Sequence, residues 1–152
     1  MDKKEFYQLL NAQVAAIIDG ESDVIANMAN ISALLFESLE YVNWAGFYRL
    51  IDNELVLGPF QGKVACIRIP VGRGVCGTAV SENQTQLIAD VHRFDGHIAC
   101  DASSNSEIVI PVKHNGNIIG VLDIDSVNID RFDLEDKLGL EQTVALLEKQ
   151  LS

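Results

Sequence analysis

Three cysteines and two aspartates are the residues of this chain best suited to chemistry. Cys66, Cys76 and Cys100 lie on glycine-rich stretches, and Asp123 and Asp125 alternate along the predicted strand GVLDIDS. A thiol reacts as its thiolate, so neighbouring charges decide whether a cysteine is reactive. Carboxylates that crowd together repel one another, and such clusters persist where they bind a cation or share a proton. The combination predicts redox chemistry on a small cationic substrate.

The hairpin SEIVIPVKHNGNIIGVLDIDS decides whether a third acid joins the two aspartates. Side chains alternate faces along a strand, and a plain two-residue turn would put Glu107 on the opposite face from the aspartates. A three-residue loop that ends in a left-handed Gly116 pairs Lys113 with Asn117, and Glu107 then faces Asp123. Because a one-residue slip would mix apolar and polar sides, burial favours this second register. We therefore predict the three-residue loop and one acidic face.

The acidic trio of Glu107, Asp123 and Asp125 has two candidate cations, a divalent metal and an ammonium group. The sequence shows no further oxygen ligands at calcium-loop spacing. It also lacks the close CxxC pair that is common in zinc sites. We therefore expect no metal, and an ammonium group is the favoured ligand.

The residues alone leave open which thiol attacks. Free cysteine is among the most buried residue types, so inert packing is an alternative for each of them. Cys76 lies near a predicted helix start, where a thiolate is favoured. Cys100 lies in a long irregular segment beside Asp101, where acids should keep the thiol protonated until a substrate arrives.

Two further pairs have both a chemical and a structural interpretation. His92 and His97 flank Cys100 in HRFDGHIAC, and a nearby histidine could act as acid or base or could be a solvated loop residue. Trp44 and Tyr48 lie four residues apart on a predicted strand and so share a face. This aromatic pair could pack in the core or form a wall against a methyl or thioether group.

Periodicity predicts the elements that position these residues. Helices are expected over residues 2–19, 23–40 and 75–81, with a last helix capped by Asp133. Strands are expected at WAGFYRLI, ELVLG, VACIRIP, QTQLIAD and in the two arms of the hairpin above. Residues 91–106 have no regular pattern, which in a compact domain often marks a functional loop. The order predicts an α+β fold with a mostly antiparallel sheet.

Composition limits the classes of protein. At 152 residues a single domain over 1–152 is expected. The net charge of −11 argues against binding to a phosphate backbone, so we expect no nucleic-acid partner. No signal peptide and no apolar run of membrane-spanning length is evident, which predicts a cytoplasmic protein without membrane association. In that reducing compartment three cysteines are more consistent with chemistry than with a disulfide framework.

Several long stretches resemble the free methionine-R-sulfoxide reductases, which are small GAF-domain enzymes. They are NWAGFYRL, LGPFQGKVACIRIPVGRGVCGTAV, GHIACDASSNSEIVIPV and GVLDIDS, in the family's order and spacing. The resemblance covers nearly the whole chain after the first helix. It implies a single GAF-like domain with helices on one face of the sheet and a ligand pocket on the other.

The resemblance also implies an activity and a role for each site residue. The reaction would be reduction of free L-methionine-(R)-S-oxide without a bound cofactor, with thioredoxin as the reductant, in oxidative stress repair. Cys100 matches the nucleophile, Cys66 the principal resolving thiol and Cys76 an auxiliary thiol. The acidic trio matches the residues that handle the substrate's amino group and sulfoxide oxygen, and the aromatic pair those around its methylthio end. The family often forms dimers, so a homodimer is an expectation. The alternative is a stand-alone GAF module that binds a small ligand or senses redox state.

Overall fold

A six-stranded antiparallel sheet is the centre of the computed structural model, which describes residues 1–98 and 103–152. The strands are β1 (Val42–Ile51), β2 (Glu54–Gly62), β3 (Arg68–Pro70), β4 (Gln86–Ile88), β5 (Ser106–His114) and β6 (Asn117–Ser126). Their order across the sheet is β3-β2-β1-β6-β5-β4. The helices are α1 (Lys3–Ile18), α2 (Val24–Ser38), α3 (Gly74–Glu82) and α4 (Leu134–Lys149), with a short 3₁₀ turn at Val91–Arg93. The predicted α+β class is confirmed.

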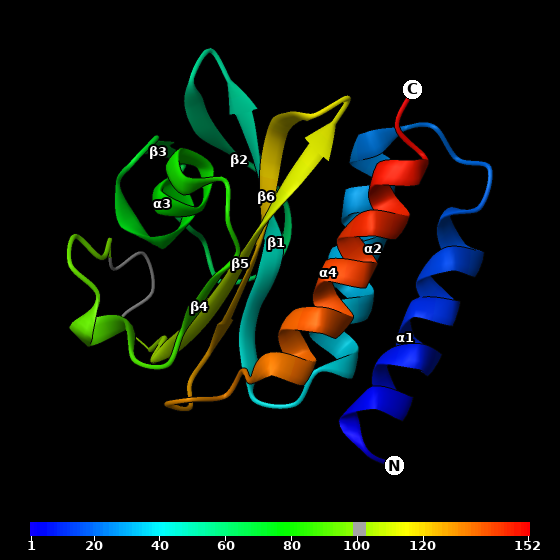
Figure 1. Cartoon of the computed structure of the whole chain (residues 1–152), viewed down its shortest axis with the longest axis horizontal. Helices are drawn as coiled ribbons and strands as arrows, with labels where there is room; N and C mark the ends of the chain where they lie inside the picture. The colour runs from blue at the N-terminus through cyan, green and yellow to red at the C-terminus, as the bar shows by residue number, and fades with distance from the viewer. Residues whose placement is uncertain (99–102) are drawn as a thin grey trace.

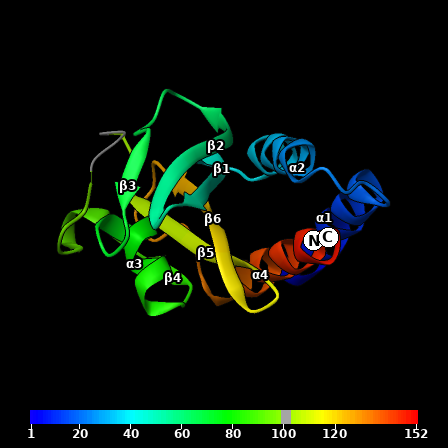
Figure 2. The ribbon, with the colours of Figure 1, turned by 90° about the horizontal axis from the view of Figure 1, so that it is seen from above.

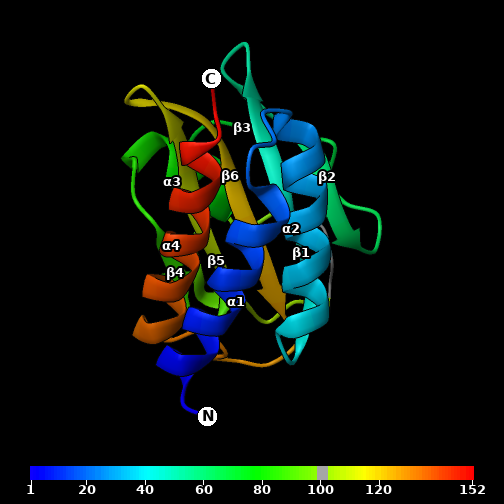
Figure 3. The same ribbon diagram turned by 90° about the vertical axis from the view of Figure 1, so that its right-hand side faces the viewer.

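The sheet separates a thick helical layer from a thinner layer that contains the site. α2 and α4 lie on one face of the sheet, and α1 packs outside them (Figures 1 and 3). Seen from above, α3 and β3 lie on the side opposite these three helices (Figure 2). Apolar side chains of α1, α2, α4 and one sheet face form the larger core. The alternation predicted for the hairpin follows this division, with Ile108, Leu122 and Ile124 in that core.

Caps fix the helices close to their predicted ends. Asp2 and Asp23 cap α1 and α2, and each side chain accepts a hydrogen bond from a first-turn amide. Asp133 and Asp136 form a reciprocal capping box at the start of α4. The buried Asp136 carboxylate also accepts from Lys3 Nζ and Tyr7 Oη, both at 2.6 Å, and so ties α1 to α4. No helix in residues 1–98 and 103–152 is long and apolar enough to cross a membrane.

The β5–β6 hairpin contains a correction to the predicted register. The turn is the two-residue Asn115-Gly116, both with positive φ, and it pairs His114 with Asn117. A bulge at the next step of the ladder then shifts the register by one, so that Glu107 lies opposite Asp125. The predicted three-residue loop and the predicted pairing of Glu107 with Asp123 are therefore wrong. The prediction that Glu107 shares a face with the two aspartates is right, because the bulge returns the apolar side chains of both strands to the buried face.

The strand predicted at VACIRIP is also shorter than expected. Only Arg68–Pro70 pairs with β2, and residues 63–67 form a loop. The carbonyls of Lys63 and Cys66 accept hydrogen bonds from the side chains of Trp44 and Tyr48, at 3.1 and 2.8 Å. Side-chain donors from β1 therefore hold this loop, and its residues Val64 and Ala65 line the site.

Candidate active site

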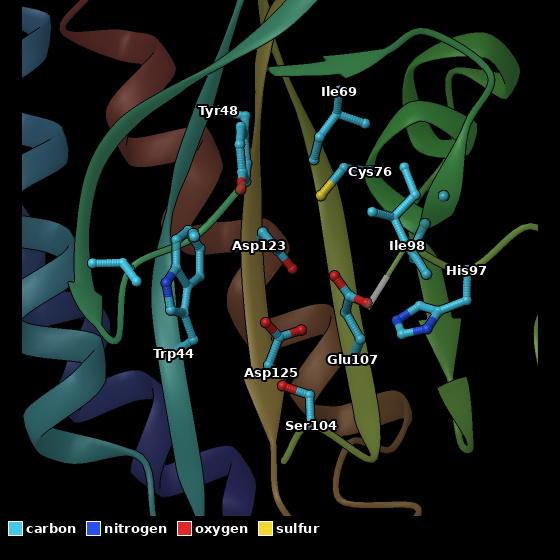
Figure 4. Close-up of a pocket in the computed structure, with 14 residues that line it drawn as sticks. Trp44, Tyr48, Ile69, Cys76, His97, Ile98, Ser104, Glu107, Asp123 and Asp125 are labelled. Carbon is cyan, nitrogen blue, oxygen red and sulfur yellow. The ribbon is translucent and has the colours of Figure 1, made fainter. Parts of the chain in front are cut away.

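The pocket lies on the sheet face opposite the helical layer. It is bounded by β1, by the start of β5, by the second half of β6, by the start of α3 and by the loops around residues 64–65 and 97–98. In Figure 4 the acidic trio lies at the centre, with the aromatic pair on one side and Cys76, Ile98 and His97 on the other. The ligand pocket that the resemblance implied is thus present on the expected face. The residues that line it are Trp44, Tyr48, Val64, Ala65, Ile69, Gly74, Val75, Cys76, His97, Ile98, Ser104, Glu107, Asp123 and Asp125.

The acidic trio is brought together by two neighbouring strands. Glu107 on β5 lies directly opposite Asp125 on β6, and Asp123 is two residues further along the same face. Glu107 and Asp123 are only 7% and 5% exposed. Burial, followed by the charges of Asp123 and Asp125, raises the pKa of Glu107 well above its usual range. Burial and the neighbouring acids therefore favour the protonated form of Glu107.

The side chain of Asp123 is placed to accept a hydrogen bond from a ligand. Burial raises its pKa, and hydrogen bonds from the side chains of Glu107 and Cys76 oppose that rise. Among the described residues, its Oδ1 is buried and has no hydrogen-bond partner. An orphaned buried carboxylate oxygen costs free energy unless a ligand donates to it. The pocket thus suits a ligand that donates a hydrogen bond to Asp123, and a cationic donor would form the strongest such bond.

Cys76 lies in the pocket wall as a buried neutral thiol. Burial, together with the nearby acids, raises its pKa well above the usual value, and its side chain hydrogen-bonds Asp123. The helix start that made it a candidate nucleophile does not overcome this desolvation. Its place depends on close packing, since a Cβ added at Gly77 would come within 2.5 Å of the Pro70 carbonyl oxygen. The positive φ of Gly74 also suits glycine at the start of this helix.

The side chains around Asp123 include the atoms of a candidate metal cluster. Ligand atoms of Cys76, Glu107 and Asp123 all lie within 4.8 Å of one another. A metal ion would have to displace the protons that burial holds on Cys76 and Glu107. An ammonium group needs no such deprotonation, because it can donate directly to Asp123.

The aromatic pair forms the opposite wall of the pocket. Trp44 and Tyr48 stack with their ring centroids 5.9 Å apart, and Phe60 stacks on Trp44 at 5.1 Å. Their polar atoms hold the loop of residues 63–67, as described above. This wall therefore combines an apolar surface for a ligand with a fixed position for the backbone of Cys66. Burial raises the pKa of Tyr48 far above its usual value, so its hydroxyl stays a donor.

The two predicted histidines separate in the structure. His97 lines the pocket, and burial, together with the charge of His92, lowers its pKa. His92 instead lies in the 3₁₀ turn, where its Nε2 is 2.9 Å from Asn105 Oδ1. A neutral His97 is the member of the pair that lies where it could contact a ligand.

Sequence reasoning missed the apolar and small residues of the pocket wall. Val64, Ala65 and Ile98 come from irregular segments, where no periodicity indicates which way a side chain points. Ser104 was missed as well, and its Oγ accepts from Asn43 Nδ2 at 3.1 Å. The glycines around α3 were the available signal, because they marked where the backbone must approach closely.

The cysteine predictions are only partly placed by the structure. Cys66 is half-buried beside the pocket and packs against its apolar wall. Cys76 lines the pocket itself. Cys100, with its neighbour Asp101, lies outside the described residues.

Fold and pocket together define a GAF domain. The GAF domain family model matches residues 4–151, which is nearly the whole chain. The chain is also 63% identical to the free methionine-R-sulfoxide reductase of Escherichia coli over 152 residues, covering 100% of this chain and 92% of that protein. The chain belongs to the GAF-domain family of free methionine-R-sulfoxide reductases.

Solved structures agree with this assignment. The reduced form of fRMsr from Staphylococcus aureus has a TM-score of 0.94 at 58% identity, covering 96% of this chain and 95% of that one. Free methionine-R-sulfoxide reductase from Neisseria meningitidis, in complex with its substrate, has a TM-score of 0.95 at 43% identity. That match covers 99% of this chain and 90% of the other.

Proposed function

We propose that this protein reduces free L-methionine-(R)-S-oxide to methionine by thiol chemistry and is recycled by thioredoxin. The observation that carries the proposal is the acidic trio in the pocket, where burial raises the pKa of Glu107 and Oδ1 of Asp123 has no hydrogen-bond partner among the described residues. The named activity of relatives up to 63% identical over the full chain supports the substrate. Each part of the substrate then has a matching part of the pocket.

Asp123 and Asp125 are proposed to bind the substrate's ammonium group. An ionised carboxylate forms stronger hydrogen bonds to a charged donor than to a neutral one. A methionine sulfoxide within a peptide has an uncharged amide at this position and would leave the buried acids without a cation. The repulsion between the carboxylates of the empty site is relieved by a charged ammonium group and not by a neutral amide, so the site selects the free amino acid over a peptide.

Glu107 is proposed to supply the proton that the sulfoxide oxygen needs. Oxide is a very poor leaving group, so the oxygen must be protonated as the sulfur–oxygen bond breaks. A carboxyl whose pKa is raised by burial and by neighbouring acids can hold that proton near neutral pH. The methylthio end would lie against the aromatic pair, where an apolar group and a sulfur atom both pack well.

The redox steps balance as two exchanges. The Cys100 thiol attacks the sulfoxide sulfur, takes over the oxygen as a sulfenic acid, and methionine leaves as the reduced product. The Cys66 thiol then condenses with the sulfenic acid, which forms a disulfide and releases water. The dithiol of thioredoxin reduces this disulfide to two thiols and becomes a disulfide itself. No bound cofactor has a part in this sequence.

Cys66 is suited to the resolving role by the way its loop is held. Tyr48 Oη donates to the Cys66 carbonyl at 2.8 Å, and Trp44 Nε1 donates to that of Lys63. Two anchors on the pocket wall thus fix the backbone next to the Cys66 sulfur. Cys76, by contrast, is a buried thiol whose side chain is already hydrogen-bonded to Asp123.

Single-turnover and multiple-turnover assays of cysteine variants test the mechanism. Cys100→Ser should abolish methionine formation. Cys66→Ser should form about one equivalent of methionine and then recycle slowly with thioredoxin. Cys76→Ser is the matched control, because serine keeps a donor for Asp123, and it should still recycle. Full multiple turnover by Cys100→Ser would overturn the assignment of the nucleophile.

A further inference from the structure

The loop that carries Cys66 has a surface unlike the rest of this acidic chain. We propose that Lys63, Ile67 and Arg73, around Cys66, form the docking surface for the reductant, and that the reductant presents an apolar face with acidic residues beside its attacking thiol. This inference rests on the proposed function, since it concerns how the protein's disulfide is reduced. We call these three residues the Cys66 rim.

Exposed apolar side chains flank Cys66 on both sides in sequence. Val64 is 88% exposed and Ile67 is 67% exposed, although both belong to a β-branched type that is usually buried. Neither side chain is needed to hold the loop, because the loop's anchors are the backbone carbonyls of Lys63 and Cys66. A second backbone contact, from Leu57 N to the Ile67 carbonyl at 2.8 Å, leaves the Ile67 side chain on the surface. The apolar surface beside Cys66 is therefore available to a partner.

Charge is distributed unevenly around this loop. All 22 Asp and Glu residues of the chain lie outside the stretch from Leu55 to Ser81, which contains three cations. Arg68 pairs with Glu54 at the edge of the sheet, with 3.0 Å between the nitrogen and the carboxylate oxygen. Lys63 and Arg73 are exposed, and the structure's described ion pairs include neither of them. The stretch of sequence that contains Cys66 is thus positive on a chain with a net charge of −11, and the acids nearest to it in the structure are those inside the pocket.

Lys63 and Arg73 are each adjacent in sequence to a residue of the pocket wall. Lys63 precedes Val64 and Arg73 precedes Gly74, and both of these following residues line the same cavity. Arg73 is the residue before α3, so its backbone is fixed by the helix start. The proposed surface therefore combines a cation in the loop that contains Cys66 with a second cation before the start of the helix that contains Cys76.

Electrostatic complementarity indicates the chemistry of the partner. A chain of this net charge repels acidic proteins over most of its surface, so an acidic partner would be directed to the Cys66 rim. Exchange requires the partner's thiolate to reach the sulfur of Cys66 and form a mixed disulfide, which a second partner thiol then resolves. Desolvation of Ile67 by an apolar partner face would exclude water from that exchange.

Reductant-specific kinetics test the surface. Thioredoxin, thioredoxin reductase and NADPH drive turnover of the free R-sulfoxide, and dithiothreitol drives it in a parallel assay. The variants are Ile67→Ser, Lys63→Glu and Arg73→Glu. Val64 is left unchanged because it also lines the pocket.

Each charge reversal should lower kcat/KM for thioredoxin about 3-fold at low salt, and Lys63→Glu with Ile67→Ser about 10-fold or more. Turnover with dithiothreitol should stay unchanged, because a small uncharged dithiol needs no docking surface. The charge effects should shrink as ionic strength rises. The matched controls are Lys4→Glu on α1 and Leu138→Ser on α4, which are exposed on the helical layer and should have no effect.

Three outcomes would overturn the inference, and they are distinguishable. Unchanged kcat/KM for thioredoxin in all three rim variants would exclude the surface and leave the proposed function standing. A wild-type protein that dithiothreitol recycles and thioredoxin does not would overturn both the surface and the thioredoxin step. A rim variant that changes the sedimentation of the protein from dimer to monomer would assign the surface to a second copy of the chain.

Discussion

Replacement of Asp123 by asparagine separates recognition of the ammonium group from the integrity of the fold. An asparagine at this position would have the shape of aspartate without its charge. Its oxygen could still accept from Glu107 or Cys76, which would place the NH₂ group where Oδ1 now lies unfilled. That NH₂ group would then face the substrate's ammonium, donor against donor. The change should weaken binding of the free amino acid specifically.

The size of the effect follows from the kind of interaction lost. A hydrogen bond to a charged group contributes about 1.5–3 kcal/mol. Since about 1.4 kcal/mol is a factor of ten, kcat/KM should fall about 10- to 150-fold for free methionine-R-sulfoxide. Asp123→Asn should also raise the unfolding midpoint in the absence of substrate, because burial disfavours the ionised carboxylate that the amide replaces.

The assay measures the wild type and the variant on free and on N-acetylated R-sulfoxide. The N-acetyl group removes the charge, so the two losses should not multiply, and the variant should discriminate less between the two substrates. Asp52→Asn, in the exposed β1–β2 turn, is the matched control and should leave both substrates unaffected. An equal loss on both substrates would refute contact between Asp123 and the ammonium group. A lower unfolding midpoint would show that the variant acts by disrupting the fold.

Two further predictions concern Tyr48 and Glu107. Tyr48→Phe keeps the stacked ring and removes the donor to the Cys66 carbonyl, which at about 1 kcal/mol should slow disulfide formation roughly 5-fold. Methionine formation in a single turnover should be unchanged, and an unchanged rate of thiol loss would contradict the positioning role. The pKa of Glu107 in the folded chain is above its usual value. As the pH rises above about 4.5, the unfolded chain releases the Glu107 proton while the folded chain retains it, so the free energy of unfolding falls. Glu107→Gln should therefore flatten the fall in unfolding midpoint from acid to neutral pH, and should also lower kcat. Parallel pH profiles for the two proteins would exclude the protonated carboxyl.

Local patterns were sufficient to predict most of the framework of this protein. The cap at Asp133, the positions of the long helices and the alternation along β5 and β6 all depend on neighbours in sequence. Such signals can be recognised from the order of residue types alone. They placed the acidic trio on one face even though the predicted hairpin loop is wrong.

Features that depend on tertiary contacts were harder to predict. Asn-Gly is typical of the two-residue turn that is observed, but nothing in HNGNI indicates the bulge that follows it and corrects the β5–β6 register. The β3 strand is short, and the loop before it is held instead by side chains of another strand, since Trp44 and Tyr48 donate to its carbonyls. The unfilled oxygen of Asp123 depends on the positions of Glu107 and Cys76, which come from two other elements.

NADPH oxidation with thioredoxin and its reductase tests the central claim most directly. Free R-sulfoxide, free S-sulfoxide and N-acetylated R-sulfoxide of methionine are offered separately to the fully reduced protein. The account predicts turnover of the free R form alone, because stereochemistry, the charged amine and thiol recycling are all required together. Absence of turnover on all three substrates would contradict it, and would favour a GAF module that binds a small ligand without transforming it.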